Sequence, residues 1–265
     1  MVDDLSGRIK SLEVKSAAKS ELIEITLPVW PETKRATPNS FLRSALFSAT
    51  KSATDADREY LHRAIIASQQ GIEIKFTGKR LNQDDLTLWE ALVHLVKEQP
   101  LGNICEFSAY DILKTMQLGD GGVDRERLHD GIIRLAACVV EISIDGSKAY
   151  FSSLIESGIR NDLTGRYTIQ LNRRLSNLYK QTTWLDWDQR VSLRRKPLAQ
   201  FLHGYYSTHK KPYPVKIETL HKLSGSKSKK IAEFKQRLIK ALDDLVEIKF
   251  LKRYLVENDT LSVDK

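Results

Sequence analysis

The C-terminal stretch SKKIAEFKQRLIKALDDLVE, residues 228–247, predicts an amphipathic helix. At 100° per residue, apolar side chains that recur at spacings of three, four and seven form one stripe that faces a core. The stripe consists of Ile231, Phe234, Leu238, Ala241, Leu242 and Leu245. The opposite face is polar and carries Lys229, Glu233, Gln236 and Lys240, with Lys230 and Arg237 on its flank. That polar face is available for an external partner.

The segments around this helix predict a winged helix-turn-helix domain. Gly225 breaks the chain before the helix, and Asn258-Asp259 supplies the tight turn of a hairpin after it. The other predicted elements are a long helix over 187–209 interrupted near Pro197, a short helix over 217–223, and strands over 248–256 and 261–263. Three helices followed by a hairpin is the order of a winged helix.

The polar face of the helix has the chemistry of a DNA reader. In a helix-turn-helix, the N-terminal part of the second helix faces base edges in the major groove. Gln pairs with adenine, Lys or Arg with guanine, and Glu accepts a hydrogen bond from cytosine. We expect base contacts from Lys229, Glu233, Gln236 and Arg237. The alternative is an ordinary surface helix of mixed charge.

Phosphate contacts are expected around this helix. The turn that contains Ser226 can present backbone N–H groups and the helix N-terminus to a phosphate. The cations expected to bind phosphates are Lys227, Lys230, Lys240, Lys252 and Arg253. A further basic cluster, Arg194, Arg195 and Lys196, precedes Pro197 in the predicted long helix and would contact the DNA backbone or bridge two domains.

The same order of elements is predicted upstream. The expected elements are a strand over 72–76, a helix that Asn82 caps and Pro100 ends, a helix that Ser108 caps, a helix over 123–137, strands over 139–144 and 149–154 around Asp145-Gly146, and a strand over 167–171. Acidic neighbours cancel the charge of its third helix. We therefore expect weaker DNA contacts through Arg125, Arg127 or Arg134, or a role in protein association.

The predicted fold is α+β and helix-rich, with tandem winged-helix domains. Residues 1–70 form an N-terminal arm with a Pro-bearing segment, because proline disfavours helix interiors and central strands. Residues 71–183 form the first winged-helix domain, for association and weaker DNA contacts. Residues 184–265 form the second, which is the main DNA-binding domain.

The distribution of charge supports this division. The chain has a formal net charge of +8, but residues 166–265 hold 22 Lys or Arg against 10 Asp or Glu. Residues 1–165 hold 20 against 24 and are slightly acidic. A cationic C-terminal half favours a polyanion partner, most often nucleic acid. A merely solvated basic surface is the alternative.

Several function classes find no support in the sequence. It has no transmembrane run and no secretory signal pattern, which predicts a cytoplasmic protein. Its two cysteines and six histidines show no metal-binding spacing, and no phosphate-binding GxxxxGK[ST] loop occurs. Asp186 and Asp188 fit a nuclease carboxylate pair less well than a helix cap. We expect a protein that is not an enzyme and needs no metal or cofactor.

Specific strings resemble a known family. They are Trp30-Pro31-Glu32, Pro38-Asn39, Arg43-Ser44-Ala45-Leu46-Phe47, Ser207-Thr208-His209, the string PYPVKIET over 212–219, and Gly225-Ser226. Together they resemble the TrfA family of plasmid replication initiators, from about Leu27 to the C-terminus. The resemblance implies a tandem winged-helix initiator that binds repeated origin sites (iterons), helps open an AT-rich region and recruits the host helicase and initiator protein. It also implies exchange between a homodimer and a DNA-binding monomer, with the dimer contact in the first domain.

One segment departs from the family pattern. Members can carry a clamp-binding pentapeptide of the type Gln-Leu-Ser-Leu-Phe before the Trp-Pro segment, but residues 20–25, SELIEI, lack both the Gln and the Phe. The resemblance therefore does not extend to binding of the sliding clamp. A winged-helix transcriptional repressor would share the fold and the charge, and only the family strings favour an initiator over it.

Overall fold

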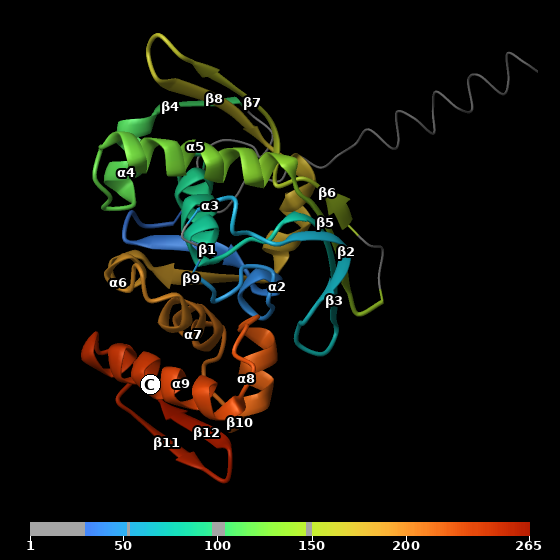
Figure 1. The fold of residues 1–265 in the computed structure, drawn as a ribbon, viewed down its shortest axis with the longest axis vertical. Helices are drawn as coiled ribbons and strands as arrows, with labels where there is room; N and C mark the ends of the chain where they lie inside the picture. The colour runs from blue at the N-terminus through green and yellow to red at the C-terminus, as the bar shows by residue number, and fades with distance from the viewer. Residues whose placement is uncertain (1–29, 52–53, 97–103, 147–149) are drawn as a thin grey trace, which may run out of the picture.

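The computed structural model describes residues 30–51, 54–96, 104–146 and 150–265. Helices and strands are both well represented, so the fold is mixed α+β rather than helix-rich as the sequence predicted. Buried apolar residues form two cores, one built from residues 30–191 and the other mainly from residues 193–261. The two cores follow one another along the long axis of the molecule (Figure 1). Within the described ranges, every helix is too short or too polar to cross a bilayer.

The three predicted helices of the first core are present. They are α3 (Gln83–Leu95), α4 (Ala109–Thr115) and α5 (Gly122–Ala137). Asn82 and Ser108 both form capping boxes, in which the cap side chain and an Asp three residues later satisfy each other's backbone N–H groups. The glycine at position 131 allows α5 to approach α3, because a Cβ there would lie 2.6 Å from Leu88 Cδ2. Pro100, the predicted helix terminator, lies outside the described residues.

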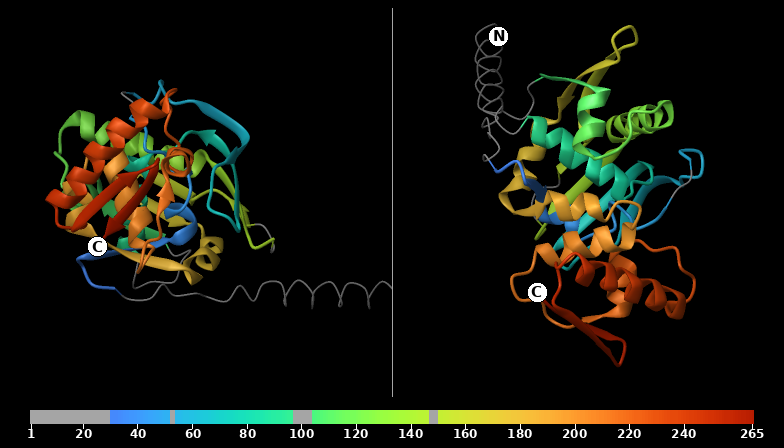
Figure 2. Two further views of the ribbon diagram at one scale, coloured as in Figure 1. Left: turned by 90° about the horizontal axis from the view of Figure 1, so that it is seen from below. Right: turned by 90° about the vertical axis from the view of Figure 1, so that its left-hand side faces the viewer.

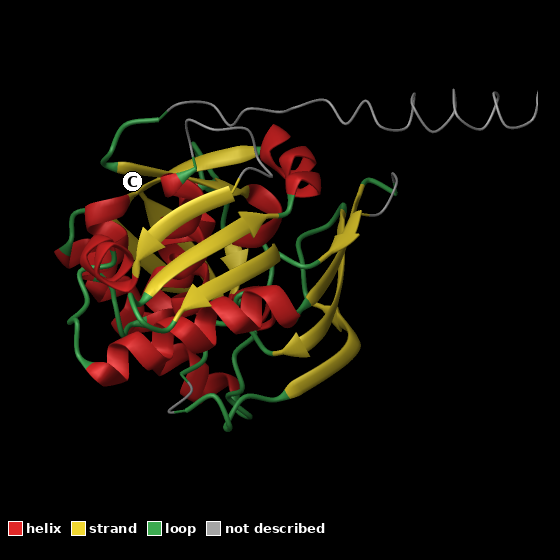
Figure 3. Ribbon diagram, turned by 90° about the horizontal axis from the view of Figure 1, so that it is seen from above, coloured by secondary structure: helices red, strands yellow, loops and turns green. Residues whose placement is uncertain are grey.

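The strands of the first core form three antiparallel sheets. The four-stranded sheet has the order β2-β3-β5-β6, and a three-stranded sheet of order β4-β8-β7 lies over the helices (Figure 3). The strands are β2 (Tyr60–Ile66), β3 (Ile72–Lys79), β4 (Ile104–Ser108), β5 (Val139–Ile144), β6 (Tyr150–Ser152), β7 (Ile155–Asn161) and β8 (Arg166–Leu171). The predicted hairpin at Asp145-Gly146 is confirmed by the pairing of β5 with β6. β7 was not predicted because nearly all of its residues are exposed and show no alternation.

The Pro-bearing segment belongs to the body of the molecule. β1 (Lys34–Pro38) pairs antiparallel with β9 (Thr182–Asp186), and α2 (Asn39–Leu42) follows directly. Pro38 ends a strand of a two-stranded sheet, in which both strands are edge strands and a proline is tolerated. The buried apolar side chains of this region are Trp30, Phe41, Leu42, Leu46 and Phe47. This segment is therefore extended, as expected, and also supplies part of the first core.

The second core is built by helices and a C-terminal hairpin. Its elements are α7 (Pro197–Ser207), α8 (Ile217–Leu223), α9 (Ile231–Glu247), β10 (Val215–Lys216), β11 (Arg253–Glu257) and β12 (Thr260–Asp264). The sheet order is β10-β12-β11, and the β11–β12 hairpin projects from the end of the molecule (Figure 2). Asn258 and Asp259 both have positive φ (47° and 55°), as a two-residue type I′ turn requires.

The interruption predicted near Pro197 is confirmed and divides the helix completely, and two other sequence predictions for this region need correction. The predicted long helix is two helices, α6 (Trp187–Ser192) and α7, because Arg195 adopts a left-handed φ of 63° and Pro197 starts a new helix. α9 begins at Ile231 instead of Ser228, with Lys230 as an extended N-cap. The first strand of the hairpin begins at residue 253 instead of 248.

A buried ion pair joins α6 to the first core. The Arg190 side chain is fully buried, and its Nε lies 2.9 Å from Oε2 of the equally buried Glu90 on α3. The guanidinium also donates to Gln83 Oε1 (3.0 Å) and to the carbonyl of Gln200 on α7 (3.2 Å). Burial raises the pKa of Glu90, while Arg190 and a hydrogen bond from Thr37 favour the ionised carboxylate. This one side chain therefore contacts both halves of the chain.

Replacing Arg190 with Met should lower the free energy of unfolding by about 3–5 kcal/mol, because Glu90 would stay buried without its cation. The double variant R190M/E90M should recover much of this loss, since neither charge then remains. Urea denaturation measures both values. Arg63→Met, at the exposed pair with Glu141, is the control and should leave the unfolding free energy near that of the wild type. A cost for R190M as small as that of the control would contradict a central role for the pair.

Candidate nucleic-acid interface

The turn between α8 and α9 is held by its own hydrogen bonds. Gly225 has a φ of 61°, in the left-handed region that favours glycine. The Ser228 N–H donates to Ser226 Oγ (3.3 Å), and His221 Nε2 lies 3.0 Å from the Ser228 carbonyl oxygen. The His221 ring also packs edge-on against Phe234, with 4.8 Å between ring centroids. These contacts set the position at which α9 begins.

α9 presents one continuous polar face to solvent. Its predicted apolar stripe is buried from Phe234 to Leu245, whereas Ile231 in the first turn is 39% exposed. The exposed side chains of the first three turns include Glu233, Gln236, Arg237 and Lys240. Arg237 Nη1 donates to Ser228 Oγ at 3.0 Å, which places its guanidinium over the preceding turn. Three of the four predicted base readers therefore lie together on one face of α9, and the fourth, Lys229, lies in the turn just before it.

Most of the predicted phosphate binders are free cations. Three of the five, Lys230, Lys240 and Lys252, are exposed and make no ion pair with any residue that the structure describes, as does the predicted base reader Lys229. Lys227 is also exposed, but its Nζ lies 3.2 Å from Glu59 Oε2. Lys252 directly precedes β11 at the base of the hairpin, and its N–H donates to the Asp264 carbonyl oxygen (2.8 Å). Arg253 forms an exposed pair with the Asp264 carboxylate at 3.4 Å. Unpaired positive charge therefore lies at Lys252, at the base of the hairpin, and at the start of α9.

The basic cluster before Pro197 bridges elements of the molecule. Arg194 donates to the carbonyl of Gln117, which follows α4. Lys196 Nζ lies 2.7 Å from Asp244 Oδ1 on α9. Arg195 is exposed and makes no hydrogen bond or ion pair within the described part of the chain. Of the two roles considered for this cluster, bridging is the one that Arg194 and Lys196 fill.

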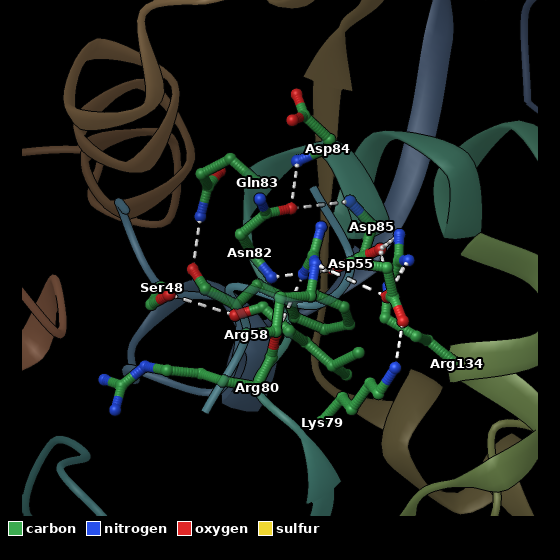
Figure 4. Close-up of polar contacts among 12 residues, drawn as sticks. Ser48, Asp55, Arg58, Lys79, Arg80, Asn82, Gln83, Asp84, Asp85 and Arg134 are labelled. Carbon is green, nitrogen blue, oxygen red and sulfur yellow. Dashed lines mark hydrogen bonds and ion pairs between the residues drawn. The ribbon is translucent and has the colours of Figure 1, made fainter. Parts of the chain in front are cut away.

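The predicted contacts of the first unit are locally neutralised. Arg125 Nε pairs with Asp120 (2.7 Å), and Arg127 Nη1 lies 3.9 Å from Asp124. Arg134 is 9% exposed and pairs with Asp55 (2.6 Å) and Asp85 (2.7 Å), as Figure 4 shows. Arg134 therefore has a structural role instead of the predicted DNA contact.

Sequence reasoning missed the contacts that seat the second unit on the first. Arg43 Nε donates to Thr208 Oγ1 and its Nη2 to the Thr208 carbonyl, both at 2.9 Å. The Ala49 N–H donates to the carbonyl of Ser224 at the end of α8 (2.7 Å). The string RSALF over 43–47 and the string STH over 207–209 were noted as family features, but no local pattern shows that they meet.

A cavity of about 510 Å³ lies between α3, α5 and the α6–α7 connection. Its walls combine apolar side chains such as Leu88 and Leu128 with the paired charges of Asp85 and Arg134. Within the described residues, no group of three or more His, Cys, Asp or Glu side chains could hold a metal ion. The cavity lies apart from the polar face of α9.

Comparisons with known proteins identify relatives of this chain. The plasmid replication initiator protein TrfA of Escherichia coli is 25% identical over 258 residues, which cover 92% of this chain and 67% of that protein. The crystal structure of domains 2 and 3 of RctB superposes with a TM-score of 0.56 at 16% identity and covers 86% of this chain and 96% of that one. The Pi initiator protein in complex with iteron DNA superposes with a TM-score of 0.54 at 11% identity, with 89% and 99% covered.

The two solved structures share the fold of this chain at low identity. The model of the family described as TrfA protein matches residues 11–265, nearly the whole chain. The chain belongs to the TrfA family.

Proposed function

We propose that this protein is a plasmid replication initiator that binds repeated origin sites in duplex DNA through its C-terminal unit. Family membership and the relative named as a plasmid replication initiator support this function. The observation that carries it is the exposed face of α9, where Glu233, Gln236 and Arg237 combine base-pairing chemistry with unpaired lysines on both sides. The fold is shared with the Pi initiator, which was solved in complex with iteron DNA, and this supports the proposal that the chain binds repeated origin sites.

In the proposed complex, α9 enters the major groove and the β11–β12 hairpin lies along the backbone as a wing. The two cores then correspond to two winged-helix domains, and the first of them begins near residue 30, ahead of the boundary predicted at residue 71, and runs to about residue 191. The first domain would associate in a homodimer that exchanges with the DNA-binding monomer. Its neutralised arginines, Arg125 and Arg127, support a weaker DNA contact than that of α9.

Origin opening by this protein would be driven by binding energy. The sequence has no nucleotide-binding loop, so hydrolysis of ATP by this chain has no support. Host proteins, including the replicative helicase and the host initiator, would then extend the opened region in the cytoplasm. Binding of the sliding clamp has no support, because the residues at 20–25 lack the family's clamp-binding pattern and lie outside the described structure.

Gln236→Ala and Lys252→Ala should separate base reading from phosphate binding. Loss of the Gln236 amide should weaken binding to the origin site by about 1–3 kcal/mol and leave random duplex unaffected. Loss of Lys252 should weaken binding to both duplexes and lower the salt slope of log K by about one unit. Fluorescence anisotropy over a salt series measures both. An unchanged salt slope for K252A would remove Lys252 from the phosphate contacts.

The competing function is transcriptional repression, since the same site would serve a repressor. A plasmid that carries the candidate origin but lacks this gene should replicate only when the protein is supplied in trans, and transformation frequency measures this. The G225V variant, with a strained turn before α9, should lose the activity. Sequence-specific DNA binding without any support of replication would favour the repressor.

A further inference from the structure

The turn before α9 rests directly on the end of the β2–β3 ribbon of the first core. Arg80, the residue after β3, donates from Nη2 to the Gly225 carbonyl at 3.2 Å. A Cβ at position 225 would lie 2.8 Å from Arg80 Nη2 and 3.0 Å from Ser48 Cβ, so a side chain larger than glycine does not fit there without a shift. The Arg80 side chain extends away from the place where Asp55, Asp85 and Arg134 meet (Figure 4). The Arg80 side chain therefore lies beside the turn before α9 and not beside Arg134.

A single carboxylate lies between two cations from different halves of the chain. Glu59 Oε2 is 3.2 Å from Lys227 Nζ and 3.8 Å from Arg80 Nη1. The backbone sets part of this arrangement, because the Arg80 N–H donates to the Glu59 carbonyl oxygen at 2.8 Å, where the pairing of β2 with β3 ends. The side chains of Glu59 and Lys227 are about half exposed, at 48% and 57%. The carboxylate thus occupies an anion position that solvent and large ligands can reach.

We propose that Arg80 and Lys227 form a binding site for one DNA backbone phosphate, and that Glu59 occupies this site in the DNA-free protein. A guanidinium and an ammonium that hold a carboxylate can hold a phosphate oxygen in the same way. Helix-turn-helix proteins are positioned by phosphate contacts around the recognition helix, and Lys227 lies in the turn just before α9. This inference rests on the proposed function and adds two residues, Glu59 and Arg80, that sequence analysis did not consider.

The arrangement has a consequence for affinity. A phosphate that enters the site must displace the Glu59 carboxylate, so Glu59 competes with DNA for Lys227 and Arg80. Glu59 competes with a phosphate of the DNA backbone, so its effect on affinity does not depend on the DNA sequence. Because Arg80 comes from the first core and Lys227 from the second, a phosphate held by both also fixes the two units relative to the DNA.

The test compares Glu59→Gln with Glu73→Gln. Glu73, on β3, pairs with Lys75 at 2.9 Å and has a similarly exposed side chain (61%). E73Q therefore changes the net charge of the protein by the same amount as E59Q, but away from Lys227 and Arg80. The probe is a short duplex of random sequence, and its Kd is measured by anisotropy at several salt concentrations. E59Q should lower Kd about two- to fivefold, a range set by the usual strength of an exposed ion pair. E73Q should change Kd little.

The variant Lys227→Met links the effect to this site. E59Q should bring no gain in a K227M background, whereas it should keep its full gain in the matched K75M background. Equal effects of E59Q and E73Q, or a gain that persists in K227M, would overturn the proposal. If the wild-type protein did not prefer origin DNA over random duplex, the proposed function would be contradicted. The Kd values of the variants for the random duplex would still show whether Arg80 and Lys227 bind a phosphate.

Discussion

The buried ion pair between Arg190 and Glu90 is the constraint on which the arrangement of the two halves depends. Two opposite charges can be buried away from water only when they form an ion pair with each other and other polar groups supply their remaining hydrogen bonds. Glu90 on α3 and the Gln200 carbonyl on α7 both meet the Arg190 guanidinium, so α6 cannot turn without exposing a buried charge to apolar surroundings. The bend between α6 and α7 then directs the chain into the second core.

Polar contacts carry this constraint outward to the DNA-binding surface. Arg43 holds the end of α7 at Thr208, and Arg80 holds the turn before α9 at Gly225. α9 is therefore positioned by its own core and by side chains of the first unit. Charge follows the same division: the arginines of α5 are neutralised by neighbouring aspartates, whereas Lys229, Lys230 and Lys240 at α9 make no ion pair with any residue that the structure describes. In the proposed function, association and DNA reading would use different surfaces of one molecule.

Periodicity and capping predicted the helices well, because these signals are local. Asn82, Ser108 and Asp186 cap helices as expected, and the apolar stripe of α9 is buried apart from Ile231. The interruption predicted near Pro197 is confirmed and separates α6 from α7, whereas the predicted start of α9 at Ser228 was wrong because Lys230 is extended. The partners of Arg80, Arg134 and Arg190 lie far away in sequence, and no local pattern reveals a pairing of that kind. The base-reading role of α9 stays a prediction.

Cleavage of DNA from a single labelled position tests most directly whether α9 reads the major groove. Burial raises the pKa of Cys138 to about 12 and also raises that of Cys105, so both native thiols should resist labelling. A Gln236→Cys variant can then carry iron-EDTA at one site. The account predicts strand cleavage confined to a few adjacent nucleotides within each origin repeat, and none from Glu73→Cys. Cleavage that is absent from the repeats, or spread evenly along the duplex, would contradict it.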